Sequence, residues 1–397
     1  MGQINKLLRE YWSNLLLLLA GLIGVIFVIW FRIVTIPNGY SSNEWIVRNN
    51  LVNKRYNFLY LWHHVSYAPY NLALMVPQYL DRYGLFSVRS VGAFFGLLSV
   101  GVFFYIIWRW WGTLIAILST ILFVSDFWFL QTARNEGPVV LYILAALIII
   151  ALGFVVRNKK NHDTKTLFSA LLGLILLYIP GMIWFVIAAC VLQRKFISNE
   201  FKKLPIQVKL IIPIAGLIFI TPLIHACFVN INVLKTILGF PIRFSIHVFL
   251  INLVHWPLII FIRNPVISSY SLGHLPVLSI FNDIMFVLGL YWIWIKRNLD
   301  RFYLLGATLV LSWVLYALGG TVSIYLGLPF IMCIAATGMA FIIGEWFSVF
   351  PRNPLARAVG ISILTVAVLA VCLYHFDQYF IAWPKASTTL SLYSTHT

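Results

Sequence analysis

Long apolar runs separated by short polar segments recur along the whole chain, and they set the first expectation for its fold. About 20 apolar residues cross the hydrocarbon core of a bilayer as an α-helix. The runs predict membrane-spanning helices over residues 14–32, 90–108, 113–130, 138–156, 166–179, 181–193, 208–228, 276–295, 302–319, 321–346 and 358–375. The pattern predicts an all-α, polytopic transmembrane helix bundle of about 11 spans, built as a single membrane domain over residues 1–397.

The polar segments between the runs orient the predicted bundle. Basic residues are most frequent in segments such as 157–165 and 194–203, and cytoplasmic loops carry an excess of Lys and Arg. Eleven spans then place the N-terminus in the cytoplasm and the C-terminus on the extracytoplasmic side. The outer side receives a long first loop of residues 33–89, a second loop of residues 229–275 and a short tail of residues 376–397.

Two segments leave the number of crossings open. Residues 247–262 are apolar but short, and two histidines, an asparagine and a proline interrupt them. We expect an interfacial or re-entrant helix there, whereas a full crossing would reverse the orientation of everything that follows. Around residue 180, Pro180-Gly181 predicts a break between two short helices, with one long kinked helix as the alternative.

Composition supports the membrane interpretation. Hydrophobic residues make up 61% of the 397 positions and charged residues only 10%, and a soluble domain of this length could not bury so much apolar surface. The formal net charge of +17 does not indicate nucleic-acid binding, because the basic residues lie between apolar runs. The four cysteines stand singly within apolar runs, which indicates packing residues and neither disulfides nor a metal site.

The few acidic residues point to the outer side as the place for chemistry. Of only 11 Asp and Glu residues, Glu44 lies in the first outer loop and Glu136 in the short loop before the span 138–156. The first loop is also rich in aromatic residues, which predicts interfacial helices resting on the membrane. Glu136 precedes a proline that starts a helix, so a helix-capping acid with Arg134 as its partner is an alternative role.

Several short motifs resemble the core of the GT-C glycosyltransferases, the superfamily that includes protein O-mannosyltransferases and aminoarabinose transferases. These motifs are Ser42-Asn43-Glu44, Ala68-Pro69-Tyr70, Ser87-Val88-Arg89 and Ala133-Arg134-Asn135-Glu136-Gly137-Pro138. The segment from Asp377 to Pro384 is similar to the one that follows the last span in many bacterial members. Asn43 and Glu136 depart from the pattern, because Asp is usual at the corresponding places.

The resemblance implies a glycosyltransferase of the bacterial plasma membrane. Such an enzyme would move a hexosyl or pentosyl unit, with inversion, from a polyprenyl-phosphate donor to an acceptor hydroxyl on a glycan, a lipid or a protein. The hydroxyl needs a carboxylate to take its proton, and the departing phosphate needs positive charge. A polytopic transporter or lipid flippase is the alternative; paired charges within spans and two repeated halves would favour it.

These requirements assign roles to residues on the outer side. We expect Glu44 to act as general base, and Glu136 as a second acid that binds the acceptor or, together with Glu44, a Mg²⁺ or Mn²⁺ ion. The expected ligands of the donor phosphate are Arg134, Lys54, Arg55, His63 and His64. For Lys54 and Arg55, anchoring at the membrane interface is the alternative role, and for His63 and His64 it is a structural role.

Overall fold

The described part of the chain is all-α, as the sequence predicts. The computed structural model describes residue 16 and residues 19–135, 137–157, 162–263, 272–296 and 300–393. Within these ranges helices are joined by turns and short loops, and an isolated β-bridge pairs Thr35 with Asn38. Every predicted span contains a helix of the structure, which confirms the helical bundle.

Some of the helices are long and apolar enough to cross a membrane, and others are too short. In the described ranges, the helices that are long and apolar enough are Leu85–Trp111, Gly137–Phe154, Ile206–Val229, Ile324–Val349 and Pro354–Lys385. Two bent pairs raise the number from 5 to 7 if each pair is one span. Shorter apolar helices cover Leu19–Trp30, Ile246–Phe261, Ile280–Ile295 and Phe302–Ala317. The count of 11 crossings stays a prediction.

The break at Pro180-Gly181 is confirmed. Helix α9 (His162–Leu176) ends before it and α10 (Met182–Leu192) begins directly after it. Gly181 has a φ of 77°, a left-handed conformation that glycine adopts without steric cost. One continuous kinked helix is therefore wrong.

The segment predicted to lie beside the bundle is a short helix. Helix α14 (Ile246–Phe261) has 16 residues, fewer than the about 20 that cross a bilayer. It packs against α16 (Asp300–Ala317) through a stacked pair of indole rings, Trp256 and Trp313, whose centres are 5.8 Å apart. The indole of Trp313 also donates a hydrogen bond to the Leu253 carbonyl oxygen at 2.8 Å.

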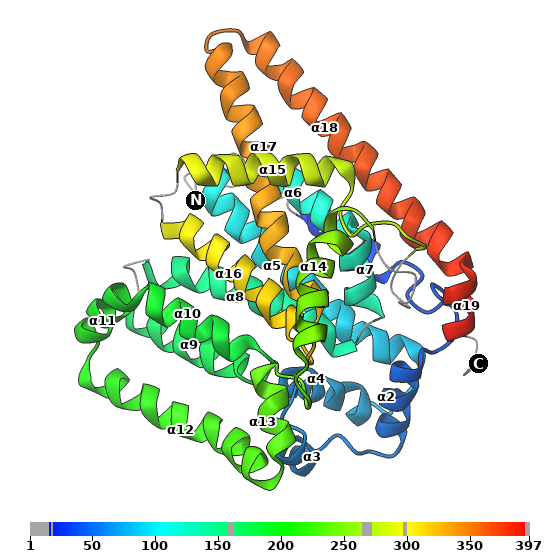
Figure 1. Cartoon of the computed structure of the whole chain (residues 1–397), viewed down its shortest axis with the longest axis vertical. Helices are drawn as coiled ribbons and strands as arrows, with labels where there is room; N and C mark the ends of the chain where they lie inside the picture. The colour runs from blue at the N-terminus through cyan, green and yellow to red at the C-terminus, as the bar shows by residue number, and fades with distance from the viewer. Residues whose placement is uncertain are drawn as a thin grey trace, which may run out of the picture.

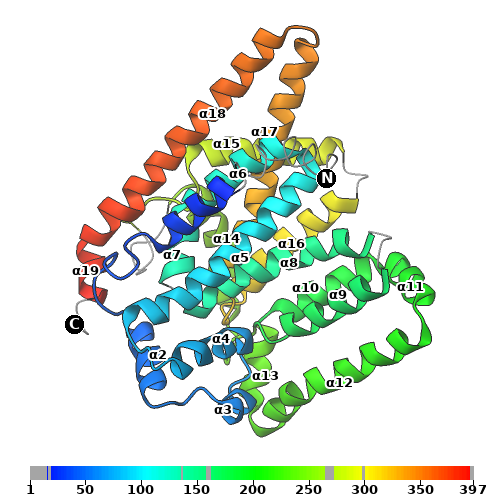
Figure 2. The same cartoon turned by 180° about the vertical axis from the view of Figure 1, so that it is seen from behind.

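The core of the bundle surrounds α17 (Leu328–Val349), which packs against α5 (Leu85–Trp111), α8 (Val140–Arg157) and α15 (Ile280–Ile295). In its apolar stretch 83% of the residues are buried, against 11% in α12 (Ile206–Val229). α17 continues into α18 (Pro354–Phe376), and the two form a hairpin that projects from the rest of the molecule (Figures 1 and 2).

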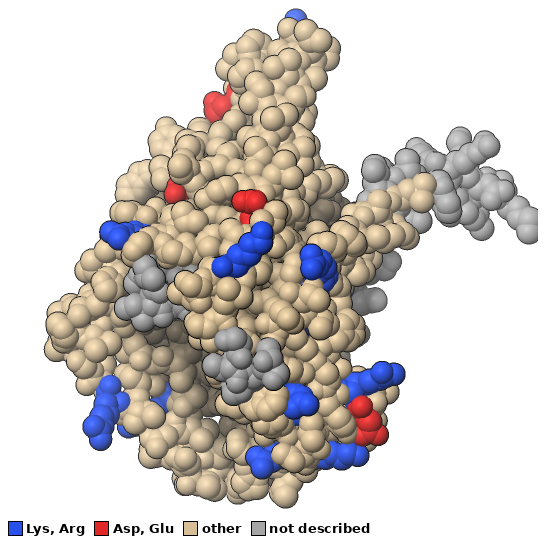
Figure 3. All heavy atoms as spheres, turned by 90° about the vertical axis from the view of Figure 1, so that its right-hand side faces the viewer, with Lys and Arg blue, Asp and Glu red and all other residues tan. Residues whose placement is uncertain are grey.

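Much of the remaining apolar surface faces outward. Leu217 and Ile218 in α12 expose 70% and 65% of their area, and many other large apolar side chains are also exposed. The face drawn in Figure 3 carries few charged side chains over most of its area. Lipid can solvate such a surface, whereas in water a protein that exposes it would aggregate.

The first predicted outer loop folds into helices, as expected. They are α2 (Ser42–Val52), α3 (Phe58–His63) and α4 (Ala68–Tyr79), and they gather with α13 (Ile231–Leu238) at the end of the molecule opposite the α17–α18 turn (Figure 2). α2 and α4 both pack against α5. This contact brings the first loop to the start of a buried helix.

The close packing of α15 against α17 can be tested by replacing glycines of α17 with alanine. A Cβ atom added at Gly338 would collide with the carbonyl oxygen of Met285, whereas one at Gly344, in the same helix, would meet nothing. We expect Gly338→Ala to destabilise the protein by about 1–3 kcal/mol, because the two helix backbones must separate. Gly344→Ala should leave stability unchanged or slightly higher. Thermal unfolding of the detergent-solubilised protein measures both, and equal midpoints would contradict the close contact.

Candidate active site

The carboxylate of Glu44 is held in place by the start of its own helix. Residues Ser41 to Glu44 form a capping box: the Glu44 amide donates to the Ser41 hydroxyl at 3.3 Å, and the Ser41 amide donates to Glu44 Oε2 at 2.8 Å. This sequence spacing satisfies two backbone donors that the first turn of a helix leaves free. The side chain is 4% exposed, so its charge needs a partner inside the protein.

Arg89, near the start of α5, supplies that partner. Its Nε donates to Glu44 Oε1 at 2.7 Å and its Nη2 to Oε2 at 3.2 Å. The guanidinium also donates to the carbonyl oxygens of Ile33, Pro37 and Gly39 at 2.7, 2.8 and 2.9 Å. A guanidinium has five N–H groups, and these five contacts use all of them. Arg89 therefore joins the turn after the first helix to the start of α2 and has no donor left for a ligand.

Arg134, the last residue of α7 (Phe127–Arg134), is also buried but has a different set of hydrogen-bond partners. Its Nη2 donates to the Phe31 carbonyl oxygen at 2.8 Å and its Nη1 to that of Val28 at 3.4 Å, so it caps the end of the helix Leu19–Trp30. The Nε has no hydrogen-bond partner. Among the described residues, no carboxylate forms an ion pair with Arg134. Arg134 is 1% exposed, and some of its N–H groups have no acceptor among the described residues.

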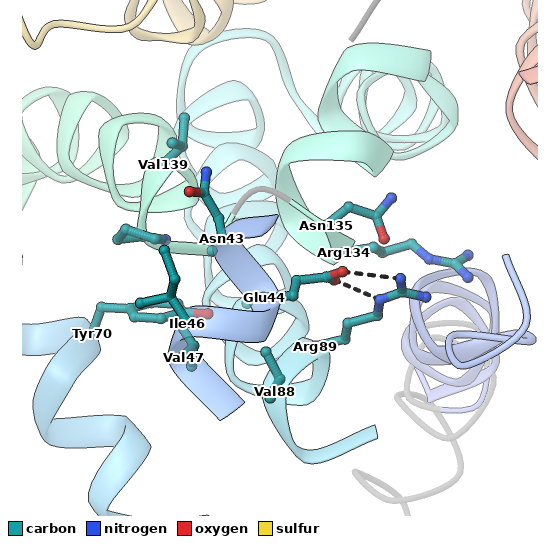
Figure 4. A pocket seen from close by; sticks show the side chains of 13 residues that line it. Asn43, Glu44, Ile46, Val47, Tyr70, Val88, Arg89, Arg134, Asn135 and Val139 are labelled. Carbon is teal, nitrogen blue, oxygen red and sulfur yellow. Dashed lines mark hydrogen bonds and ion pairs between the residues drawn. The ribbon is translucent and has the colours of Figure 1, made fainter. Parts of the chain in front are cut away.

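A cavity of about 320 Å³ lies between these groups. Figure 4 shows the Glu44 carboxylate directed toward the Arg89 guanidinium, with Arg134 on the same side. The first loop, the start of α5 and the α7–α8 connection line the cavity through Asn43, Glu44, Ile46, Val47, Tyr70, Val88, Arg89, Gly92, Arg134, Asn135, Gly137, Pro138 and Val139. Carboxylate, guanidinium, carboxamide and hydroxyl groups thus meet beside an apolar wall.

Tyr70 contributes a neutral hydroxyl to this cavity. Burial raises the pKa of Tyr70 far above its usual value, and the nearby Tyr56 and Glu44 raise it further. The hydroxyl therefore stays protonated at physiological pH. It can donate or accept a hydrogen bond, but it cannot serve as a base.

Two of the predicted site residues, Glu44 and Arg134, line the same cavity although 90 positions separate them in the chain. Glu136 lies outside the described residues. Its neighbours on either side, Asn135 and Gly137, both line the cavity.

The predicted basic pair of the first loop is not among the lining residues. Lys54 forms an exposed ion pair with Asp81 at 3.2 Å, and Arg55 donates to the side chain of Asn50 at 3.4 Å. The hydrogen bond and charge of Asp81 raise the pKa of Lys54, while hydrogen bonds from Tyr83 and Lys54 lower that of Asp81. These contacts join two turns of the loop at its surface.

The predicted histidine pair also lies away from the lining. His63 and His64 are exposed at the end of α3, and each ring hydrogen-bonds through Nδ1 to a carbonyl oxygen one helical turn earlier. The His64 ring stacks on Tyr60, with centres 4.1 Å apart. The structure therefore brings Arg134, but neither of the two basic pairs, to the carboxylate.

Sequence reasoning missed the roles of Arg89, Tyr70 and Asn135. Arg89 stood within a quoted motif but received no function, and the predicted span began one residue after it. A charged residue at the edge of a long apolar run marks a buried or functional position, and that signal was present. No three His, Cys, Asp or Glu side chains converge anywhere in the described ranges to hold a metal ion.

Comparison with known proteins places this site in a known fold. The sequence matches no protein-family model and no curated protein. The structure is similar to crystal structures of ArnT from Cupriavidus metallidurans in the apo state, with a TM-score of 0.56, and bound to undecaprenyl phosphate, with a TM-score of 0.53. Both are 13% identical over 96% of this chain, and 78% and 76% of the ArnT chain is covered.

The chain shares the fold of these ArnT structures. At this identity the likeness concerns the arrangement of the helices alone. It confirms the fold that the motifs in the first loop and around Arg134 imply.

We predict that breaking the buried Glu44–Arg89 ion pair strongly lowers the stability of the protein. Arg89→Met leaves the buried Glu44 carboxylate without its counter-ion and removes the Arg89 donors from three carbonyl oxygens, so we expect a loss of about 3–5 kcal/mol. The double variant Arg89→Met/Glu44→Leu should recover part of that loss, since no unpaired charge remains. The coupling energy is obtained by comparing the stability change of the double variant with the sum of the changes in Arg89→Met and Glu44→Leu, each measured by thermal unfolding. Strictly additive effects would contradict a buried pair, and Lys54→Met, in an exposed pair, serves as a control without measurable change.

Proposed function

We propose that this chain is a membrane glycosyltransferase that moves a sugar from a polyprenyl-phosphate donor to an acceptor hydroxyl at the extracytoplasmic face. One observation carries the proposal: a single cavity is lined both by an oriented carboxylate, Glu44, and by a guanidinium, Arg134, that has N–H groups without a partner among the described residues. The GT-C fold supports it over the transporter alternative, because the similar ArnT is a transferase and has been crystallised with undecaprenyl phosphate.

Glu44 is the proposed general base. Its Oε2 accepts hydrogen bonds from both Arg89 and the Ser41 amide, whereas Oε1 accepts one from Arg89. A carboxylate oxygen has two lone pairs, so Oε1 retains one for the acceptor hydroxyl. As the hydroxyl oxygen attacks the anomeric carbon, its proton passes to Glu44. The bond from the anomeric carbon to the phosphate oxygen breaks on the opposite face, which inverts the configuration.

Arg134 is the proposed ligand of the departing phosphate. Two of its five N–H groups donate to carbonyl oxygens of the first helix, and the others have no partner in the described ranges. A buried charge without a counter-ion is costly. A phosphate group would supply the missing negative charge and accept charge-assisted hydrogen bonds. These bonds strengthen as negative charge grows on the leaving oxygen.

Glu136 is proposed as a second acid that binds the acceptor. A Mg²⁺ or Mn²⁺ ion, if the enzyme uses one, would bind Glu136 together with the lone pair of Glu44 Oε1 that Arg89 leaves free.

The size of the cavity limits what it can enclose. At about 320 Å³ it lies near the small end of ligand sites. We infer that it admits one hexosyl or pentosyl ring together with the acceptor oxygen, while the prenyl chain of the donor stays outside in the lipid. The acceptor is a hydroxyl on a glycan, lipid or protein.

Replacing Glu44 tests the proposal. We expect Glu44→Gln to lower kcat about 10²–10⁴-fold, because the amide cannot take the proton of the acceptor. Transfer is measured with a radiolabelled sugar on undecaprenyl phosphate, using protein reconstituted in liposomes and normalised to the folded fraction.

Ser41→Ala is the matched control for this experiment. It removes one half of the capping box while keeping the carboxylate, so it lowers stability but should leave kcat within about threefold of wild type. Wild-type turnover by Glu44→Gln would exclude Glu44 as the base. An equal loss in Ser41→Ala would reduce Glu44 to a structural role.

A further inference from the structure

The segment that follows α18 contacts both arginines that line the cavity, although its own residues are not part of the lining. It consists of a π-helical turn Asp377–Ala382, a 3₁₀ turn Trp383–Lys385 and α19 (Ser387–Tyr393). We call residues 377–393 the C-terminal segment. Figure 1 shows α19 at the end of the long α18, far from the α17–α18 turn.

Buried aromatic rings fix the C-terminal segment to the bundle. Tyr379 and Trp383 are both 0% exposed, and their rings stack with centres 5.3 Å apart. Phe127, at the start of α7, packs edge-on against both of them at 5.9 and 6.1 Å. Tyr393 extends the cluster by an edge contact with Trp383 at 6.0 Å. The segment is thus a packed wall beside α7.

This wall presents ring faces to the two buried charges. The Arg134 guanidinium lies 5.1 Å from the ring centres of Tyr379 and Phe380, and Arg89 lies 5.8 Å from that of Tyr393. The side-chain amide of Asn135 donates to the Tyr379 hydroxyl at 2.7 Å. Tyr379 therefore touches two consecutive residues that line the cavity.

A ring face and a carboxylate stabilise a guanidinium in different ways. A carboxylate accepts its N–H groups and consumes them, as Glu44 does for Arg89. A ring face attracts the positive charge through its quadrupole and leaves every N–H group free. Because Arg134 is held by two rings and two carbonyl oxygens, it stays charged, buried and available as a donor to an anion.

We propose that the C-terminal segment supports the cavity from behind its lining residues and that Tyr379 is a positioning residue, which holds Arg134 as the receptor for a phosphate group. The ring of Tyr379 fixes the guanidinium, and its hydroxyl fixes the neighbouring Asn135. The assignment of the phosphate to the donor rests on the proposed function. The receptor itself rests on the contacts of Arg134.

Binding measurements on the purified full-length chain in detergent test this proposal. Undecaprenyl phosphate is the probe, and the dissociation constant is followed by tryptophan fluorescence. We expect Tyr379→Leu to raise the dissociation constant roughly tenfold or more, because a desolvated ring–cation contact is lost. Tyr379→Phe keeps the ring and should stay within about threefold of wild type. Arg134→Gln should abolish saturable binding.

Phe127→Leu is the packing control, since Phe127 contacts the Tyr379 ring from α7 and makes no ring contact with Arg134. It should leave the dissociation constant within about threefold of wild type. An equal loss in Phe127→Leu and Tyr379→Leu would overturn the proposal, and so would unchanged binding in Tyr379→Leu. If Tyr379→Leu does not fold, Phe380→Leu removes the second ring, and unchanged binding there is the contradicting result.

Two further comparisons separate the possible outcomes. Inorganic phosphate is titrated in parallel: the same order of variants without preference for the lipid would support the receptor and assign it to free phosphate. If binding depends on Tyr379 but no sugar transfer occurs, the proposed function fails and this inference stands. If transfer depends on Glu44 while Tyr379→Leu binds normally, this inference alone fails.

Discussion

The buried ion pair between Glu44 and Arg89 is the contact on which the arrangement of the site depends. It joins the start of α2 to the start of α5, and the other N–H groups of Arg89 close the turn that follows the first helix. Ionised groups are expensive inside a protein unless each finds a complete set of partners. Here Arg89 has an acceptor for each of its N–H groups, and Glu44 accepts from Arg89 and the Ser41 amide, so the first loop has one well-defined position on the bundle.

The two buried arginines illustrate two ways of keeping a charge inside. Arg89 uses every donor on a carboxylate and three carbonyl oxygens, which makes it a structural clamp. Within the described residues, Arg134 relies on two carbonyl oxygens and two ring faces, which leaves donors unused. The residue with unused donors suits a ligand, whereas the saturated one suits a scaffold. Although both side chains line the same cavity, Arg89 therefore has a structural role and Arg134 is the proposed ligand-binding residue.

The proposed chemistry draws on elements from distant parts of the chain. The carboxylate comes from the first loop, the proposed phosphate ligand from the end of α7, and the aromatic support from the C-terminal segment. Because α5 and α17 are deeply buried, they fix these peripheral pieces relative to one another. The site thus lies where a rigid bundle meets loops, an arrangement common to enzymes whose specificity varies more than their fold.

Features that depend on interactions between neighbouring residues could be predicted from the sequence alone. Apolar runs predicted the helices, and Pro180-Gly181 predicted the break between two of them. The folded structure was needed to show which basic residue pairs with Glu44 and which one keeps donors without a partner among the described residues. It also shows that Lys54, Arg55, His63 and His64 lie away from the cavity lining. Those facts depend on packing between segments far apart in the chain. Hydropathy and spacing carry no information about such contacts.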